Sequence, residues 1–146
     1  MIYHIEVSLE TKEEFSQFLS SKIKEYNNLH SRFHRESREK GAVVPINIMA
    51  SDDLGNCIGG ISAEVYWGWV EINDFWFQEE FRSKGLGSKL LTQVEEVSKE
   101  KGATKALLTT FDFQARFFYE KRGYKIAGEI KDYPPGSSYY TMVKQL

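Results

Sequence analysis

The chain has 146 residues, the size of one domain, with 27% charged and 41% hydrophobic residues, a composition typical of globular proteins. Its 19 basic and 21 acidic residues leave a formal net charge of -2, which excludes a global field that attracts nucleic acid or anionic membrane. The single cysteine, Cys57, excludes an intrachain disulfide and a cysteine-only zinc cage. With no basic leader and no apolar run of about 20 residues, we expect one cytoplasmic domain over residues 1–146, without nucleic-acid or membrane partners.

The first third of the chain predicts a strand followed by two helices. Residues 3–9 alternate between apolar and polar side chains with period two, as a half-buried strand does. Thr11 and Glu14 have the spacing of a capping box, and apolar residues then recur at helical intervals up to Ile23. The polar stretch 25–40 is interpreted as a second, loosely held helix.

The rest of the chain predicts strands and helices in mixed order. Aromatic and β-branched residues over 69–77 are typical of a central buried strand, and Leu86 to Lys101 has the clearest helical periodicity. Shorter patterns predict strands at 45–50, 57–66, 106–110, 124–130 and 139–143, with a short helix at 114–121. This order favours an α/β (α+β) sandwich.

A glycine-containing loop between the central strand and the clearest helix carries the strongest chemical signal. Its sequence runs Arg82, Ser83, Lys84, Gly85, Leu86, Gly87, Ser88. Glycines allow close approach of a ligand, and the free amides and dipole of a helix start attract phosphate oxygens. The loop lacks the ending of a Walker motif and the third glycine of a dinucleotide fingerprint. Two interpretations stay open. The loop binds the pyrophosphate of another cofactor, or its glycines only separate the strand from the helix.

A second stretch of sequence supports the interpretation of the glycine loop as a cofactor site. The pattern Arg82-x-x-Gly85-x-Gly87 after an apolar strand resembles the pyrophosphate motif of the GNAT superfamily of N-acetyltransferases. The stretch from Asp112 to Tyr124 is similar to the later motif of that family, written N-x-x-A-x-x-F-Y-x-x-x-G-F/Y. The two runs occur in the family's order, and the resemblance covers the chain from about Trp69 onwards.

The resemblance implies a GNAT-like fold, with a mixed, twisted, mostly antiparallel sheet of about six to seven strands flanked by about four helices. It implies acetyl-CoA as co-substrate, with the strand before the glycine loop splayed from its neighbour and offering main-chain groups to the pantetheine arm. The cofactor-binding residues carried over are Phe75, Trp76, Phe77, Arg82, Ser83, Lys84, Gly85, Leu86, Gly87, Ser88, Asp112, Gln114 and Phe118. Asp112 replaces the usual Asn and lacks an amide donor; Gln114 is its substitute, and capping of the following helix is the alternative for Asp112.

The same resemblance gives Tyr119 the role of a general acid that protonates the leaving thiolate, with a packed core tyrosine as the alternative. Glu71 is the candidate general base and Asp74 a weaker one, because carboxylates on a central strand need a partner or a function. A structural salt bridge explains either carboxylate equally well. Period-two alternation places Glu71, Asn73 and Phe75 on one strand face and Asp74 on the other.

The expected reaction is direct transfer of an acetyl group from acetyl-CoA to a primary amine of a small molecule or peptide, without an acyl-enzyme. Two alternatives stay open: a silent acyl-CoA-binding module, supported by Asp112, and an interaction domain without cofactor. His30 and His34 share a helical face but lack a third ligand, so no metal is expected. By the same resemblance, a homodimer through a sheet edge or through the C-terminal strand at 139–143 is a further expectation.

Overall fold

The computed structural model describes all residues from 1 to 146, which divide into residues 1–39 (unit 1) and residues 40–146 (unit 2). Unit 1 contains α1 (Glu13–His30) and α2 (Arg32–Glu36). The predicted helix near Phe15 is confirmed, but its start is Lys12 without a side-chain cap, so the Thr11–Glu14 capping box does not form. The stretch predicted as a second helix begins inside α1 and is broken at Ser31, whose hydroxyl accepts a hydrogen bond from the His34 amide.

The predicted strand at residues 3–9 is absent from the structure. These residues have no regular secondary structure, and every one of their side chains is exposed. A strand is stabilised by hydrogen bonds to a neighbour, and the alternating pattern alone does not supply one. The sequence pattern therefore describes a segment suited to pairing rather than a strand formed within this chain.

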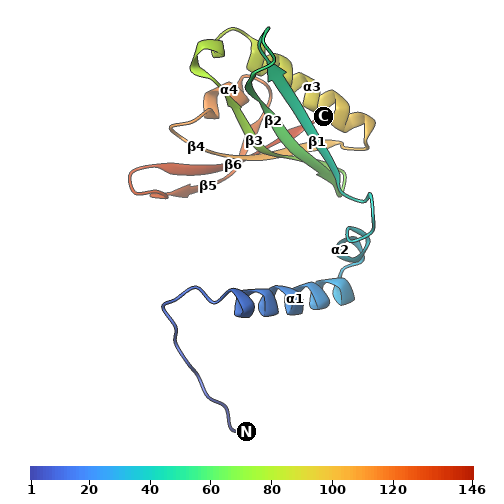
Figure 1. Cartoon of the computed structure of the whole chain (residues 1–146), viewed down its shortest axis with the longest axis vertical. Coiled ribbons are helices and arrows are strands. Elements are labelled where there is room, and N and C mark those ends of the chain that lie inside the picture. The colour runs from blue at the N-terminus through green and yellow to red at the C-terminus, as the bar shows by residue number, and fades with distance from the viewer. The chain divides into compact units, whose positions relative to one another are not determined.

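Unit 2 is built on a six-stranded sheet in the order β1-β2-β3-β4-β6-β5 (Figure 1). All neighbours are antiparallel except β3 and β4, which are parallel. A parallel pair needs a crossover, and α3 supplies it. The elements are β1 (Val44–Ser51), β2 (Cys57–Tyr66), β3 (Trp69–Phe77), a 3-10 turn (Glu79–Phe81), α3 (Leu86–Glu100), β4 (Lys105–Phe111), α4 (Arg116–Glu120), β5 (Lys125–Lys131) and β6 (Ser138–Gln145).

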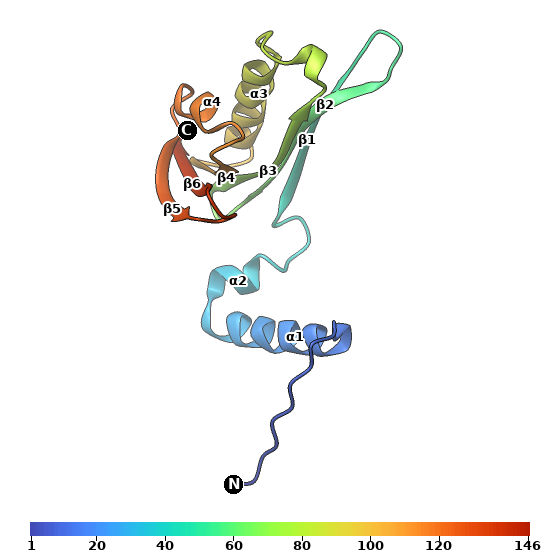
Figure 2. The same cartoon turned by 90° about the vertical axis from the view of Figure 1, so that its left-hand side faces the viewer.

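The predicted fold class is confirmed by this mixed sheet with four α-helices. Helix α3 lies along one face of the sheet against β1, β2 and β3 (Figure 2), and its Leu90, Leu91 and Val94 belong to the same hydrophobic core as Val65 and Val70. Burying such a core provides most of the stability of unit 2. No helix of the chain has the length and hydropathy needed to cross a bilayer.

The position of β3 depends on a bulge and on one close backbone approach. Pairing with β2 shifts between Ser62–Asp74 and Ala63–Ile72, which leaves Asn73 as an extra residue in β3. The bulge changes the face on which later side chains lie, so the expected common face of Glu71, Asn73 and Phe75 is wrong beyond Asn73. Gly59 has φ 149°, and a β-carbon there would lie 2.3 Å from the carbonyl oxygen of Trp76, so β2 can hold the end of β3 only with glycine.

A buried polar network joins α3 to Tyr124, the residue before β5, and to Lys144 of β6. The Tyr124 hydroxyl donates to Glu95 at 2.8 Å, and the Lys144 ammonium donates to both oxygens of Glu95 at 2.9 and 3.1 Å. Glu95 is only 9% exposed, so its charge requires these partners.

Replacement of Lys144 by Met should lower the free energy of unfolding by roughly 2–3 kcal/mol, because it leaves a buried carboxylate without its cation. Urea unfolding of the variant and of the exposed control Lys125→Met measures this difference. Equal stabilities of the two variants would show that the network does not hold α3 in place.

Candidate functional site

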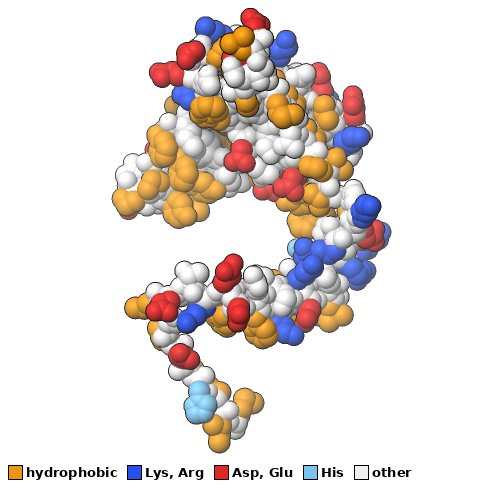
Figure 3. All heavy atoms as spheres, viewed as in Figure 1, with side chains coloured by type: hydrophobic (Ala, Val, Ile, Leu, Met, Phe, Trp, Pro, Cys, Tyr) orange, Lys and Arg blue, Asp and Glu red, His pale blue; other side chains and the backbone are white.

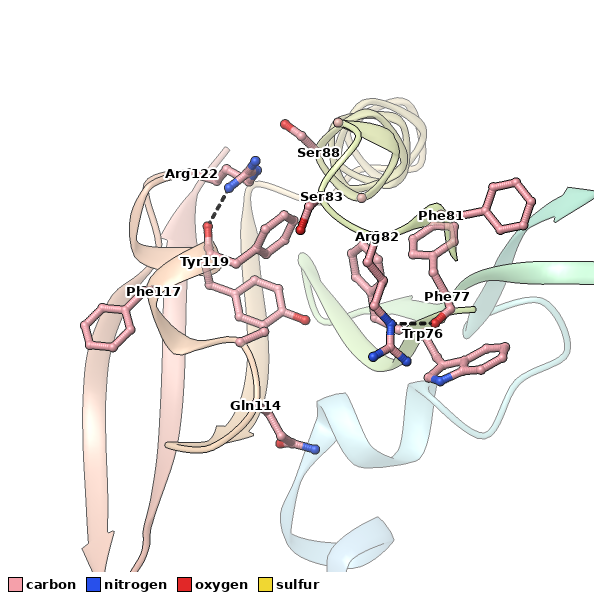
Figure 4. A pocket seen from close by; sticks show the side chains of 15 residues that line it. Trp76, Phe77, Phe81, Arg82, Ser83, Ser88, Gln114, Phe117, Tyr119 and Arg122 are labelled. Atoms are coloured by element: carbon pink, nitrogen blue, oxygen red, sulfur yellow. Dashed lines mark hydrogen bonds between the residues drawn. The ribbon is translucent and has the colours of Figure 1, made fainter. Parts of the chain in front are cut away.

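The site lies where β3 and β4 separate. Their pairing ends at Ile72 and Leu108, although β3 continues to Phe77 and β4 to Phe111. A cavity of about 610 Å³ opens beside the end of β3, on the side where β3 no longer pairs with β4, and is bounded by β3, the glycine loop and the α4 segment (Figure 4). Its lining residues are Phe75, Trp76, Phe77, Phe81, Arg82, Ser83, Gly85, Gly87, Ser88, Gln114, Ala115, Phe117, Phe118, Tyr119 and Arg122.

The glycine loop presents backbone amides at one end of this cavity. Ser83 and Gly85 have φ of 60° and 81°, and Gly85 caps α3 without any side-chain hydrogen bond. Residues with positive φ next to right-handed ones turn successive amides into a concave anion site, and the helix dipole adds to it. The Arg82 side chain is held there by a 2.8 Å hydrogen bond from Nε to the Phe77 carbonyl.

Gly87 lies in the first turn of α3, against two aromatic rings. A β-carbon at Gly87 would lie 3.5 Å from the Phe118 ring and 3.6 Å from the Phe75 ring, which is ordinary contact. A longer side chain would have to extend into the cavity. The two glycines therefore have different roles, since Gly85 provides the backbone turn and Gly87 leaves space.

Arg122 is a cation of this cavity that the sequence analysis missed. Its guanidinium lies 3.8 Å from the centre of the Phe118 ring, and Nη1 donates to the Phe118 carbonyl at 2.9 Å. Its Nε is buried and has no hydrogen-bond partner. A buried donor without an acceptor is costly, so Arg122 suits an anionic ligand in the cavity. Its position directly before Gly123 in the second motif was the available signal.

Tyr119 lies on the wall opposite Arg82, with its hydroxyl directed into the cavity (Figure 4). The residue is 8% exposed, and burial raises the pKa of its phenol to about 12. The phenol is therefore fully protonated at neutral pH. Such a group can donate a hydrogen bond to negative charge in the cavity.

A second cavity of about 420 Å³ borders the first, because Gln114 lines both. Its other lining residues are Asn73, Thr109, Phe111, Ile130, Tyr133 and Tyr139. The rings of Phe111 and Tyr133 are nearly parallel, with an interplanar angle of 7°. The centre of the Tyr139 ring lies 4.8 Å from the centre of the Phe111 ring. This cavity combines flat aromatic walls with the amides of Asn73 and Gln114.

The structure brings most of the predicted site residues together. The predicted residues Phe75, Trp76, Phe77, Arg82, Ser83, Gly85, Gly87, Ser88, Gln114, Phe118 and Tyr119 all line the first cavity. Phe81, Ala115, Phe117 and Arg122 also line it and were not predicted, although Ala115 occupies the alanine position of the second motif; no motif position marks Phe81 or Phe117.

Four predicted residues line neither cavity: Lys84, Leu86, Asp112 and Glu71. Leu86 packs against the hydrophobic core, and the backbone amide of Asp112 donates to the Ser138 carbonyl at 3.0 Å. The side chain of Asp112 does not cap α4, whose N-cap residue is Ala115 and which has no side-chain cap. Instead, Gln114 closes this turn by accepting a 2.8 Å hydrogen bond from the Phe111 amide.

Glu71 lies on the sheet face opposite α3, where it accepts a hydrogen bond from the Tyr66 hydroxyl. This hydrogen bond, together with burial, raises the pKa of Tyr66 to about 12. The contact gives the carboxylate a structural partner. Its predicted role as a base is untested by this geometry.

The raised tyrosine pKa values predict alkaline destabilisation. Unfolded tyrosines lose their protons near pH 10, whereas folded Tyr66 and Tyr119 retain theirs to about pH 12. Between these values the unfolded state binds fewer protons, so the free energy of unfolding should fall as pH rises from 10 to 12 and be insensitive to these groups below pH 10.

Denaturant unfolding in steps from pH 9 to pH 12 measures this slope. Tyr119→Phe should make the decline shallower, whereas Tyr133→Phe, which removes an exposed hydroxyl, should keep the wild-type slope. An unchanged slope in Tyr119→Phe would contradict the assignment.

Comparison with known proteins agrees with this arrangement. A sequence profile of the acetyltransferase (GNAT) family matches residues 6–124. Blasticidin-S acetyltransferase of Streptomyces morookaense is 37% identical over 98 residues, which is 66% of this chain and 72% of that protein. The crystal structure of an acetyltransferase from Bacillus cereus ATCC 14579 is 30% identical, with a TM-score of 0.84 over 99% of this chain and 98% of that one.

The fold also recurs in a structure that holds the coenzyme. The N-acetyltransferase PaiA of Thermoplasma acidophilum, solved in complex with coenzyme A, has a TM-score of 0.57 over 94% of this chain and 81% of that one, at 20% identity. The profile match spans both motifs and most of the sheet. The chain belongs to the GNAT family of acetyltransferases.

Proposed function

We propose that the protein transfers the acetyl group of acetyl-CoA directly to a primary amine of a small molecule or peptide, and that the 610 Å³ cavity holds the coenzyme. The observation that carries the proposal is the end of β3–β4 pairing at Ile72 and Leu108 beside the uncapped start of α3. This arrangement offers unpaired strand groups and helix amides to one elongated, anionic ligand.

The residues present fit each part of acetyl-CoA. The amides of the loop from Arg82 to Ser88 suit the pyrophosphate, and the Arg122 guanidinium with its unpaired Nε suits a phosphate oxygen. Backbone groups of β3 beyond Ile72 face the gap and suit the amides of the pantetheine arm, as a strand neighbour would. Lys84 and Asp112 do not line the cavity. We therefore assign to Gln114 the coenzyme contact that the resemblance gave to the first position of the second motif.

In the proposed reaction, the amine nitrogen attacks the thioester carbonyl, a carbon–nitrogen bond forms, and the carbon–sulfur bond breaks. The sulfur leaves as a thiolate, and the amine nitrogen loses one proton. The difference between the pKa of the Tyr119 phenol and that of the leaving thiol decides what Tyr119 can contribute. A phenol with a pKa of about 12 would give its proton to a thiolate of ordinary pKa, about 8.5, at a cost of roughly 4–5 kcal/mol. We therefore assign Tyr119 a hydrogen bond to the developing thiolate, with the thiol proton coming from solvent.

The second cavity is the proposed entrance of the amine, because Gln114 separates it from the coenzyme cavity. Its aromatic walls and amide groups suit a small molecule with flat and polar parts. The relative named blasticidin-S acetyltransferase makes antibiotics of that type the first acceptors to test. Glu71 is kept as the proposed base for the amine proton, two residues before Asn73 of this cavity.

Gly87→Glu should abolish the rise in melting temperature that saturating acetyl-CoA gives the wild type, because its carboxylate would extend into the cavity and repel phosphates. Gly128→Glu is the matched control, since a β-carbon there meets nothing within 4 Å and lies outside both cavities. Thermal unfolding with and without millimolar ligand provides the measurement. No shift in the wild type would remove the basis of the proposed function.

Tyr119→Phe should lower kcat roughly tenfold to a hundredfold, the worth of one hydrogen bond to a charged group. The affinity for acetyl-CoA should stay the same. Release of free thiol from acetyl-CoA is followed across a panel of amines that begins with blasticidin S. Tyr140→Phe, a buried tyrosine outside both cavities, is the control and should retain wild-type kcat. A full kcat in Tyr119→Phe would contradict the assigned role.

A further inference from the structure

Four aromatic side chains, the aromatic cluster (Phe111, Phe113, Tyr133 and Tyr139), gather at the second cavity. The Phe111 ring is nearly parallel to that of Phe113, at 6° and 5.3 Å between ring centres, and to that of Tyr133, at 7° and 6.4 Å. The centres of the Tyr133 and Tyr139 rings lie 5.7 Å apart. Phe113 and Tyr133 are 66% and 56% exposed. Figure 3 shows hydrophobic side chains gathered over the β5–β6 hairpin, whose turn carries Tyr133.

The aromatic cluster is not part of the hydrophobic core. Tyr140, the neighbour of Tyr139 in β6, is 5% exposed and belongs to the core that includes α3. Successive strand residues point to opposite faces, so Tyr139 lies on the other face of the sheet. Phe111 is paired with Tyr139 across β4 and β6 and shares that face. Exposed aromatic rings that line a concavity are typical of a binding site, since packing alone would bury them.

The polar side chains of the second cavity are all uncharged. They are the amides of Asn73 and Gln114 and the hydroxyls of Thr109, Tyr133 and Tyr139, and no Asp, Glu, Lys or Arg lines the cavity. A charged ligand would lose hydration there without meeting an opposite charge. A volume of about 420 Å³ is that of a site for a small molecule. The cavity therefore suits a small molecule whose bound part is uncharged.

Two existing hydrogen bonds decide which end of each amide remains for a ligand. The Oε1 atom of Gln114 accepts a 2.8 Å hydrogen bond from the backbone amide of Phe111, which leaves its Nε2 group as a donor. The Nδ2 group of Asn73 donates to Glu64 at 3.2 Å, which leaves the Asn73 carbonyl oxygen as an acceptor. Turning either amide round would set donor against donor or oxygen against carboxylate. The cavity thus offers one amide donor and one amide acceptor.

We propose that the second cavity binds the acceptor through a flat, uncharged aromatic ring whose edge carries a carbonyl group next to an N–H group. The ring stacks on the aromatic cluster, its carbonyl accepts from Gln114, and its N–H group donates to the Asn73 oxygen. The reacting amine lies on a substituent of this ring, next to Gln114, which lines both cavities. This inference rests on the proposed function, because it names the class of amine on which that function would act.

The same groups discriminate against charged rings. A carboxylate edge would meet the Asn73 oxygen, which cannot donate, and the Glu64 carboxylate bonded to that side chain. An amidinium edge, which has donors only, would meet the Gln114 donor without an acceptor on that side. Shape discriminates further, because a saturated ring is not flat and cannot stack on the aromatic cluster.

The first test is the binding of four probes to the full chain without coenzyme, followed by two-dimensional NMR of the isotope-labelled protein. Benzamide, which combines a flat ring with an amide edge, should bind at least tenfold more tightly than cyclohexanecarboxamide, benzoate or benzamidine. The signals that shift should include those of Phe111, Tyr133 and Tyr139. Equal affinities of benzamide and cyclohexanecarboxamide, or no binding of benzamide up to its solubility limit, would overturn the proposal. Tighter binding of benzamidine would overturn it in favour of a cationic acceptor.

The second test uses a variant of the aromatic cluster. Tyr133→Leu keeps an apolar side chain but removes a ring, so it should weaken benzamide binding roughly threefold to tenfold and leave cyclohexanecarboxamide unchanged. Leu54→Ala, an exposed residue between β1 and β2 that lines neither cavity, is the control and should bind both probes like the wild type. Equal benzamide binding by Tyr133→Leu and the control would show that the ring has no part in recognition.

The third test reverses the preference of the amide edge. Gln114→Glu keeps an oxygen for the Phe111 amide and replaces the donor by a carboxylate oxygen, so benzamidine should now bind at least tenfold more tightly than benzamide. A variant that still prefers benzamide would contradict the assigned hydrogen bond. These titrations need no turnover, so a wild type that binds benzamide but shows no acetyl-CoA thermal shift would refute the proposed function alone. The reverse result would refute this inference alone.

The last test follows transfer to two matched primary amines, para-(aminomethyl)benzamide and its cyclohexane analogue, by release of thiol from acetyl-CoA. The aromatic amine should have at least a tenfold higher kcat/KM, mainly through a lower KM, because stacking acts on binding. Tyr133→Leu should remove most of that difference. Equal kcat/KM values of the two amines in the wild type would overturn the proposed substrate class.

Discussion

The structure of the site depends on one interruption, the point at which β3 and β4 cease to pair. Parallel pairing over Trp69–Ile72 fixes both strands in one sheet, and the extra residue Asn73 then bends β3 away. Without the bulge, continued pairing would fill the gap with strand hydrogen bonds. With it, the side of β3 that faces β4 keeps unpaired backbone groups beside a cavity.

The gap persists because its two sides are held independently. On one side, Gly59 lets β2 approach Trp76 closely and keeps the end of β3 in the sheet. On the other, Tyr119 and Tyr124 pack edge to face, and Tyr124 is tied to α3 through Glu95. The same helix α3 that carries Glu95 begins with the amides of the glycine loop. The core that stabilises unit 2 therefore also positions the groups proposed to bind phosphate.

Most of the residues predicted for the coenzyme line one cavity, and this has a physical reason. Backbone requirements at Gly85 and space requirements at Gly87 restrict the residue type, so they appear as motifs. The prediction failed at residues 3–9, where side chains alternate but the backbone forms no strand. It also missed the face change after Asn73, because a bulge has no signal in an alternating pattern. Arg122 escaped notice because a surface arginine and a buried one look alike in sequence.

The second cavity, the proposed acceptor site, is harder to infer from sequence for a different reason. The second cavity is formed by side chains of β3, β4 and the β5–β6 hairpin, none of which needs a special backbone conformation there. Phe111, Tyr133 and Tyr139 are interchangeable with core aromatics in any pattern analysis, although their rings line a cavity. Selection on such walls acts through shape and polarity of the bound molecule. A family of this kind can therefore keep one coenzyme groove and change its acceptor through side chains that leave the fold intact.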